Sequence, residues 1–91
     1  QFTKGAENHS DQYSLGVVFY EMLTGVTPFQ GDHPMAVLML HVSEPPPRPS
    51  ELRADLPQAL ENILLQMLAK DPRERFRDLL EIKQKLDRLS P

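Results

Sequence analysis

Apolar residues along this chain follow helical spacing in four segments. In the clearest one, Leu60, Ile63, Leu64, Met67 and Leu68 recur at i, i+3, i+4, i+7 and i+8, the period of a helix with one buried face. The four segments predict helices over about residues 11–24, 34–43, 58–69 and 78–89. No segment shows the alternation of a strand bounded by hairpin turns. The predicted fold class is therefore all-α.

Cap and turn residues set the expected ends of these helices. Ser10 is a good N-cap for the first helix, and Gly25 can adopt the left-handed conformation that ends it. Residues 1–9 are polar and lack a sustained apolar period, so they are expected to form a loop. Pro34 suits the first turn of the second helix, whereas the proline-rich stretch 45–49 is expected to be extended.

The first helix has apolar residues around nearly its whole circumference. A helix of this kind is either buried in a large core or spans a membrane. The longest apolar run, residues 15–20, is far shorter than the ~18 residues that a membrane span needs. Three further short helices in a chain of 91 residues can hardly surround it. We therefore expect the chain to be part of a larger domain and incomplete as a domain by itself.

Composition and charge narrow the classes of function. The chain has 10 Lys and Arg against 13 Asp and Glu, and no basic stripe of the kind that nucleic-acid binding requires. It has no cysteine, so it offers neither a disulfide nor a thiolate metal site. No signal-peptide pattern follows Gln1. We expect a cytoplasmic protein without a nucleic-acid partner or a membrane span.

Two motifs stand far apart in the chain. The first, SDQYSLGVVFYEMLTG, runs from Ser10 to Gly25, and the second is LAKDP followed by Arg75 and Phe76. With PF at positions 28–29, they resemble the C-terminal lobe of eukaryotic-type Ser/Thr protein kinases, and EPPPRP followed by LRADLP is most similar to bacterial members. The resemblance covers essentially the whole chain. It implies a four-helix C-terminal subdomain of the protein-kinase-like fold, made of kinase helices F to I.

The resemblance implies roles for four residues. Asp11 corresponds to the aspartate that holds the backbone of the catalytic loop, and Val18 and Met22 correspond to supports of the apolar residues stacked below the adenine pocket. Arg75 corresponds to the arginine that pairs with the Glu of an Ala-Pro-Glu motif, which would lie just before Gln1. The plainer alternatives are a helix-start charge for Asp11 and a solvated connector residue for Arg75. The motif context favours the kinase roles.

Phosphoryl transfer needs motifs that these residues do not supply. A kinase covers the ATP phosphates with a Gly-rich loop and uses a Lys, a His-Arg-Asp loop and Asp-Phe-Gly for the phosphates and the metal. None of these is present in the sequence. The resemblance thus implies ATP and Mg²⁺ for the parent kinase, but no catalytic, cofactor-binding or metal-binding residue in this chain. His9, His33 and His41 lack metal-site spacing and are expected to be capping or surface residues.

The expected partners are proteins. The first is the remainder of the kinase domain, and protein substrates or regulators would dock on the helix that starts at Pro34 and includes Val42. Met35 and Met39 of this helix are expected to fill gaps in a core, with a place on the docking surface as the alternative. A different class of function stays open, because a stand-alone helical binding or scaffold module, or a pseudokinase lobe, could cover its apolar surface by self-association. Phosphorylation by the parent protein and sedimentation of the chain distinguish these hypotheses.

Overall fold

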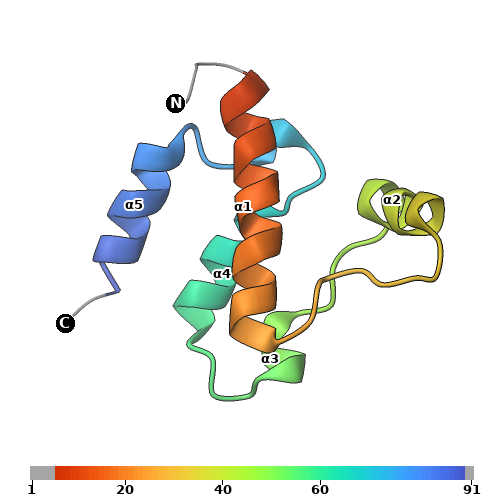
Figure 1. Ribbon diagram of the computed structural model, residues 1–91. Coiled ribbons are helices and arrows are strands. Elements are labelled where there is room, and N and C mark those ends of the chain that lie inside the picture. The colour runs from red at the N-terminus through yellow and green to blue at the C-terminus, as the bar shows by residue number, and fades with distance from the viewer. Residues whose placement is uncertain (1–5, 90–91) are drawn as a thin grey trace.

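The computed structural model describes residues 6–89, with side chains from residue 11 onward. None of the residues in this range lies in a strand, which confirms the all-α fold class. In Figure 1, α1 runs through the middle of the molecule, with α4 and α5 on one side and α2 on the other. The elements, in chain order, are α1 (Ala6–Thr24), α2 (Pro34–Ser43), α3 (Pro49–Leu52), α4 (Gln58–Met67), the 3₁₀ turn η1 (Pro72–Glu74) and α5 (Leu79–Asp87).

The start of α1 differs from the sequence-based expectation. The helix begins at Ala6, so Ser10 lies inside it and does not cap it, and the loop expected for residues 1–9 is wrong for residues 6–9. Residues 1–5 lie outside the described part of the chain. Ala6 and Glu7 are strong helix formers, but a polar turn carries no apolar period and therefore gives no periodicity signal.

Three other boundaries also differ. Pro49, expected in an extended stretch, opens the short helix α3, because proline is well suited to the first helical position. The helix expected over 58–69 ends at Met67, and the helix expected over 78–89 covers Leu79–Asp87. After both ends the backbone tightens into bonds that span three residues, Ala69 N–H to Gln66 O and Leu89 N–H to Leu86 O. Such tightening is common in last turns.

The core forms where α1 and α4 cross at Gly16. A Cβ atom on Gly16 would lie 3.0 Å from Leu68 Cδ2 and 3.2 Å from Met67 Cβ, so the crossing leaves no room for a side chain. Two groups of buried apolar residues pack around this crossing, and the second also holds α5. They are Tyr20, Leu64 and Leu68 in one group, and Ile63, Met67, Phe76 and Ile82 in the other.

The proline-rich segment is fastened to the core by hydrogen bonds. The Tyr20 hydroxyl donates to the Pro47 carbonyl at 2.8 Å. The Glu61 carboxylate of α4, which is almost fully buried, accepts from Arg48 Nη2 and from the Ser50 backbone N–H, both at 2.7 Å. Hydrogen bonding from Ser50, supported by Arg48, lowers the pKa of the Glu61 carboxyl. The prolines therefore form a rigid connector that lies against α1 and α4.

The apolar circumference of α1 is only partly covered. Gln12, Gly16 and Tyr20 are buried at intervals of four residues, whereas Val18 is 51% exposed and Met22 is 72% exposed. None of the described helices, α1 included, combines the length and apolar content needed to cross a membrane.

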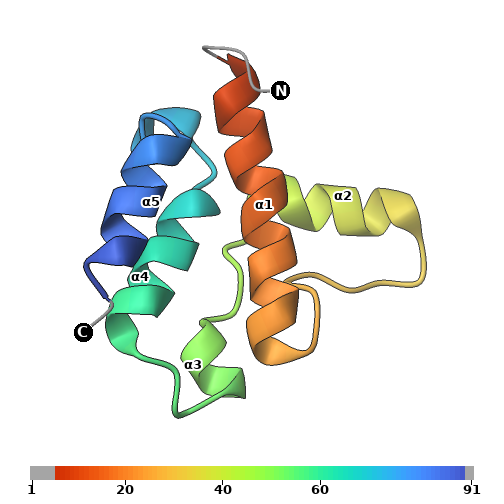
Figure 2. The same cartoon turned by 60° about the vertical axis from the view of Figure 1, so that its left-hand side comes forward.

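Helix α2 lies apart from this core. None of its residues is buried, and Figures 1 and 2 both place it on the side of α1 opposite α4 and α5. His33 caps its start by accepting a hydrogen bond from the Met35 N–H at 3.2 Å. Four of its apolar side chains are more than half exposed: Met35, Leu38, Met39 and Val42. The expectation that Met35 and Met39 fill gaps in a core is therefore wrong.

Candidate functional site

Asp11 lies in the second turn of α1, because the helix begins at Ala6. The influence of a helix terminus falls off within the first turn, so this position does not favour the interpretation of Asp11 as a helix-start charge. The half-buried Asp11 borders a cleft of about 280 Å³ that is otherwise lined by Ser14, Leu15, Val18 and Leu79. Among the described residues that line this mainly apolar cleft, Asp11 is the charged one.

Val18 and Met22 continue the same stripe of α1. They follow Asp11 at i+7 and i+11, which places Val18 about 10 Å further along the helix axis. Met22 borders a second hollow of about 250 Å³ with Phe19, Leu23, Leu60 and Leu86. In the space-filling view, apolar surface gathers over the middle of this face, where α1 runs in Figure 1. Asp11, Val18 and Met22 thus share one exposed side of α1.

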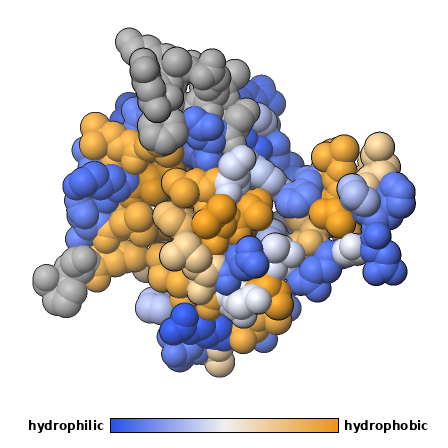
Figure 3. Space-filling model, viewed as in Figure 1, coloured by the Kyte–Doolittle hydropathy of each residue, from blue (hydrophilic) through white to orange (hydrophobic). Residues whose placement is uncertain are grey.

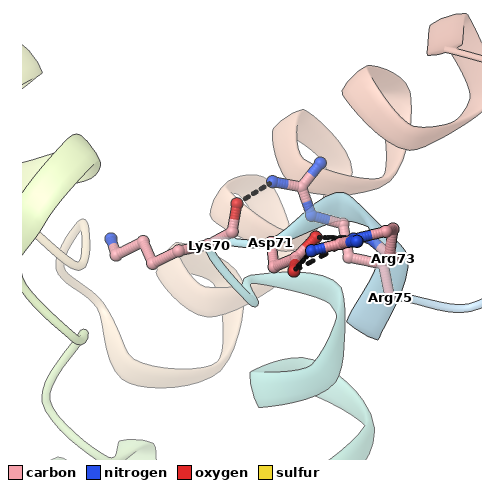
Figure 4. A network of polar contacts seen from close by, with 4 residues as sticks. All are labelled: Lys70, Asp71, Arg73 and Arg75. Carbon is pink, nitrogen blue, oxygen red and sulfur yellow. Dashed lines mark hydrogen bonds and ion pairs between the residues drawn. The ribbon is translucent and has the colours of Figure 1, made fainter.

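Arg75 is placed by the 3₁₀ turn that precedes it. Asp71 caps η1 by accepting from the Arg73 backbone N–H at 2.9 Å, and its carboxylate also pairs with the Arg73 guanidinium. Arg75 follows as the residue that ends the turn. In Figure 4, Asp71 faces Arg73, while the Arg75 guanidinium points to the carbonyl of Lys70. The Asp-Pro motif therefore forms a local turn that directs Arg75 away from Asp71.

Backbone carbonyls and an aromatic ring hold the Arg75 side chain. Its Nε donates to the Ala69 carbonyl at 2.8 Å and its Nη2 to the Lys70 carbonyl at 3.5 Å. The guanidinium carbon lies 5.0 Å from the centroid of the Tyr13 ring of α1, within the range of a cation–π interaction. Burial lowers the pKa of Arg75, which the charges of Tyr13 and Asp71 partly oppose. Arg75 is therefore half-buried, and the solvated-connector alternative does not describe it.

Tyr13 also connects this arginine to α2. Its hydroxyl lies 2.6 Å from His41 Nδ1, and the His41 ring packs edge-on against the Phe29 ring with centroids 4.8 Å apart. Lys70 Nζ donates to the His41 carbonyl at 2.7 Å and lies 4.6 Å from the Phe29 ring centroid. We call Tyr13, Phe29, His41 and Lys70 the α2 clamp. Burial lowers the pKa of His41, and the nearby Lys70 charge lowers it further.

Sequence reasoning missed the clamp and one further residue, Gln12. No spacing rule links residues 28 positions apart, such as Tyr13 and His41. Gln12 is fully buried and forms two hydrogen bonds with the backbone of Phe76. One signal in the sequence could have identified it. Gln12, Gly16 and Tyr20 share one helical row, so Gln12 is a polar residue on the face of Gly16 and Tyr20, although glutamine is seldom buried.

The predicted site residues lie at two separate places around α1. Asp11, Val18 and Met22 lie along α1, and Arg75 lies beside the same helix at Tyr13. Among the described residues, no group of three His, Cys, Asp or Glu side chains could hold a metal ion. His33 caps α2 and His41 belongs to the clamp, while the side chain of His9 lies outside the described ones.

Comparison with known proteins shows the family of this chain. The model of the protein kinase domain matches residues 3–86, which is nearly the whole chain. The chain belongs to the protein kinase family. The resemblance drawn from the two motifs is thereby confirmed.

Three of the similar proteins are bacterial Ser/Thr kinases. Serine/threonine-protein kinase PknB of Mycolicibacterium smegmatis is 46% identical over 80 residues, and PknB of Mycobacterium tuberculosis is 44% identical over 80 residues. Both matches cover 88% of this chain and 13% of the relative. A probable serine/threonine-protein kinase of Clostridium perfringens is 38% identical over 80 residues, or 12% of its length. The chain spans about an eighth of the length of these kinases.

In this kinase segment, the two motifs that are distant in sequence are neighbours in space. Gln12 of the first motif bonds to Phe76 of the second, and Tyr13 of the first contacts Arg75 of the second. The kinase motifs that contact ATP are absent from these 91 residues. Arg75 therefore lies beside Tyr13 of α1, two residues after Asp11.

Proposed function

We propose that this chain is the C-lobe part of an ATP-dependent Ser/Thr protein kinase and that it supports catalysis without taking part in the chemistry. The contact between the two motifs carries the proposal, because Gln12 and Tyr13 hold the segment of Arg75 against the end of α1 that bears Asp11. A site held together by buried hydrogen bonds can position groups brought by the rest of the domain.

In this proposal Asp11 and Arg75 hold two segments that other parts of the kinase supply. The Asp11 carboxylate accepts hydrogen bonds from the backbone of the catalytic loop. The Arg75 guanidinium pairs with the Glu of the Ala-Pro-Glu motif, for which its planar fork is well suited. The carbonyls of Ala69 and Lys70 and the ring of Tyr13 already fix the orientation of that fork.

Val18 and Met22 are proposed to contact the apolar residues stacked below the adenine pocket. Their exposure supports this role, because large apolar side chains that gather on one face commonly mark a contact surface. Leu15 and Phe19 of the same helix are half-buried beside them. In the parent kinase this side of α1 would be covered by the rest of the domain.

ATP and Mg²⁺ would bind to the remainder of the kinase. The described residues contain no group of three His, Cys, Asp or Glu side chains that could hold a metal ion, and the four glycines of the chain stand singly. When bound there, the nucleotide and metal supply the transferred phosphoryl group and the neutralisation of its charge. The role of this chain is to hold the loops that surround them.

Helix α2 is the proposed docking surface for protein substrates or regulators. The side chains of Met35, Met39 and Val42 on this helix are more than half exposed. Methionine is common on surfaces that adapt to several partners.

Phosphate transfer by the parent protein tests the proposal. Asp11→Asn is expected to lower kcat/KM toward a generic Ser/Thr protein substrate by about a hundredfold, the typical effect of displacing catalytic groups by ~1 Å. Asp87→Asn, at an exposed position of α5, is the matched control and should retain full activity. A parent protein that transfers no phosphate from ATP, or an Asp11→Asn variant as active as the parent, would contradict the proposal.

A second candidate function is a helical scaffold or pseudokinase lobe that self-associates. The exposure of Val18 and Met22 next to two apolar hollows favours it. A parent protein that binds partners and lacks phosphate transfer would support this candidate.

A further inference from the structure

Gln12 is a buried polar side chain that joins the two motifs, and the proposed function gives it no part in orienting the Arg75 side chain. It follows Asp11 in α1 and is fully buried. Its Nε2 donates to the Phe76 carbonyl at 2.6 Å, and the Phe76 N–H donates to its Oε1 at 3.1 Å. One carboxamide thus satisfies both backbone groups of the residue that directly follows Arg75.

The segment that Gln12 holds is short and extended. Arg75 has φ −75° and ψ 177°, and successive side chains point to opposite sides of an extended backbone. The Phe76 ring is buried with Ile63, Met67 and Ile82, and the Arg75 side chain turns to Tyr13. The ring of Phe76 and the carboxamide of Gln12 therefore fix the segment from two directions.

We propose that Gln12 is a positioning residue for Arg75. By holding both backbone groups of Phe76, it fixes where the Arg75 side chain leaves the backbone and keeps the guanidinium over Tyr13. The inference rests on the proposed function, in which Arg75 pairs with a glutamate of the activation segment. It goes further by assigning the placement of that arginine to one carboxamide on α1, next to Asp11.

The variant Gln12→Glu makes one of the two hydrogen bonds to Phe76 depend on pH. An ionised glutamate can accept from the Phe76 N–H but has no proton to give to the Phe76 carbonyl, whereas a protonated one can do both. Burial and the facing carbonyl oxygen raise the pKa of such a carboxyl. We compare the Gln12→Glu variant of the parent protein with the unsubstituted parent protein at each pH. The ratio of their kcat/KM values is expected to be about tenfold below one at pH 8 and to recover toward pH 6.

A matched control and a double-mutant cycle exclude a merely structural effect. Gln66→Glu, at an exposed position of α4, should show no change with pH relative to the parent. If Gln12 acts through Arg75, Gln12→Glu should cost less than about twofold at pH 8 in an Arg75→Met background, because interacting residues are not additive. Additive losses, or a pH-independent loss in Gln12→Glu, would overturn the inference.

A spectroscopic measurement tests the inference independently of activity. Arg75 Nε–H is hydrogen-bonded to Ala69 and lies by the Tyr13 ring, so its NMR signal in the arginine-labelled parent protein should be protected from exchange and shifted by the ring. Gln12→Glu should lose both properties at pH 8 and regain them at pH 6. An unchanged signal at pH 8 would overturn the inference.

The two proposals fail in different ways. If Arg75→Met leaves phosphate transfer unchanged, the proposed role of Arg75 is wrong, and the NMR signal still decides whether Gln12 positions the arginine. If Gln12→Glu does not fold at pH 8, Gln12→Asn replaces it in both measurements. Gln12→Asn keeps both polar groups on a shorter stem, and the same loss of the Arg75 signal and the same coupling are expected.

Discussion

Single residues on one row of α1 decide how closely the helices approach. Gly16 lets α1 touch the side chains of Met67 and Leu68, Tyr20 reaches Pro47 beyond them, and Gln12 reaches Phe76. The three residues face the same side of the helix. This row therefore connects α1 to three segments that follow it in the sequence.

Gly16→Ala is expected to destabilise the fold by ~1–3 kcal/mol, the usual cost of overpacking a core. The added methyl group would lie 3.0 Å from Leu68 Cδ2 and 3.2 Å from Met67 Cβ. The measurement is the free energy of unfolding of the parent protein in urea. Ser14→Ala, at an exposed position of the same helix, should stay within ~0.5 kcal/mol of the parent. Equal stability of the two variants would mean that α1 and α4 approach less closely.

Sequence reasoning assigned roles to the residues that the kinase pattern marks, and assigned none to residues that act through partners far away in the sequence. Arg75 and Asp11 were found because a pattern of neighbours marks them. Gln12 and the α2 clamp were not found, because the partners of Gln12 and Tyr13 lie 64 and 28 residues away. The roles of Asp11, Val18, Met22 and Arg75 toward the rest of a kinase stay predictions.

At the scale of elements, α2 differs from the other helices in how it is attached. Helices α1, α4 and α5 meet through buried apolar residues, whereas α2 has no buried residue and is held by the clamp around His41. Polar contacts that are partly open to solvent are weaker than a packed core. Helix α2 is therefore expected to open locally before the core unfolds.

The clamp should make the attachment of α2 sensitive to pH. The pKa of His41 in the folded chain lies below its ordinary value of 6.5, so the unfolded chain binds a proton more readily than the folded one. The stabilisation is fully present above pH 6.5 and decreases as the pH falls below it. Amide exchange in α2, relative to α4 and corrected for intrinsic rates, should become faster from pH 7 to pH 5.

Two variants check the origin of this pH dependence. His41→Gln should remove it, and Tyr13→Phe should speed exchange in α2 at all pH values, because the hydroxyl that meets His41 is lost while the ring beside Arg75 remains. A pH dependence that persists in His41→Gln would show that another group titrates.

The type of an element could be predicted where the apolar period agrees with the cap and turn residues at its ends, and less well elsewhere. The rows of α4 and α5 follow the helical period, and each element contributes buried residues to the core. The polar first turn of α1 and the four-residue helix α3 were missed. Neither has a periodic apolar face. Helix α3 is instead attached through the buried Pro49 and the hydrogen bond from the Ser50 N–H to Glu61.

At the scale of the whole molecule, one side of α1 stays open. The cleft of Asp11 and the hollow of Met22 lie along this side, and their walls are largely apolar. Figure 3 shows this apolar surface in the middle of the face. An exposed surface of this type favours association with another protein surface.

The isolated 91-residue chain is therefore expected to self-associate through the open side of α1. Met22→Glu should shift its sedimentation toward the monomer without changing its helix content, because a charge placed in an apolar contact must lose its hydration. Met39→Glu, on α2, is the matched control and should sediment as the unmodified chain does. An isolated chain that is monomeric at high concentration would contradict this expectation.

The isolation of α2 has a consequence for how related chains can diverge. The segments that lead into and out of α2 are anchored by buried residues, Phe29 before it and Pro49 after it, while the helix between them contributes nothing to the core. Substitutions on its outer face can accumulate with little cost to folding. The outer face of α2 can therefore change which partners it recognises during evolution, while the rest of the chain keeps its structure.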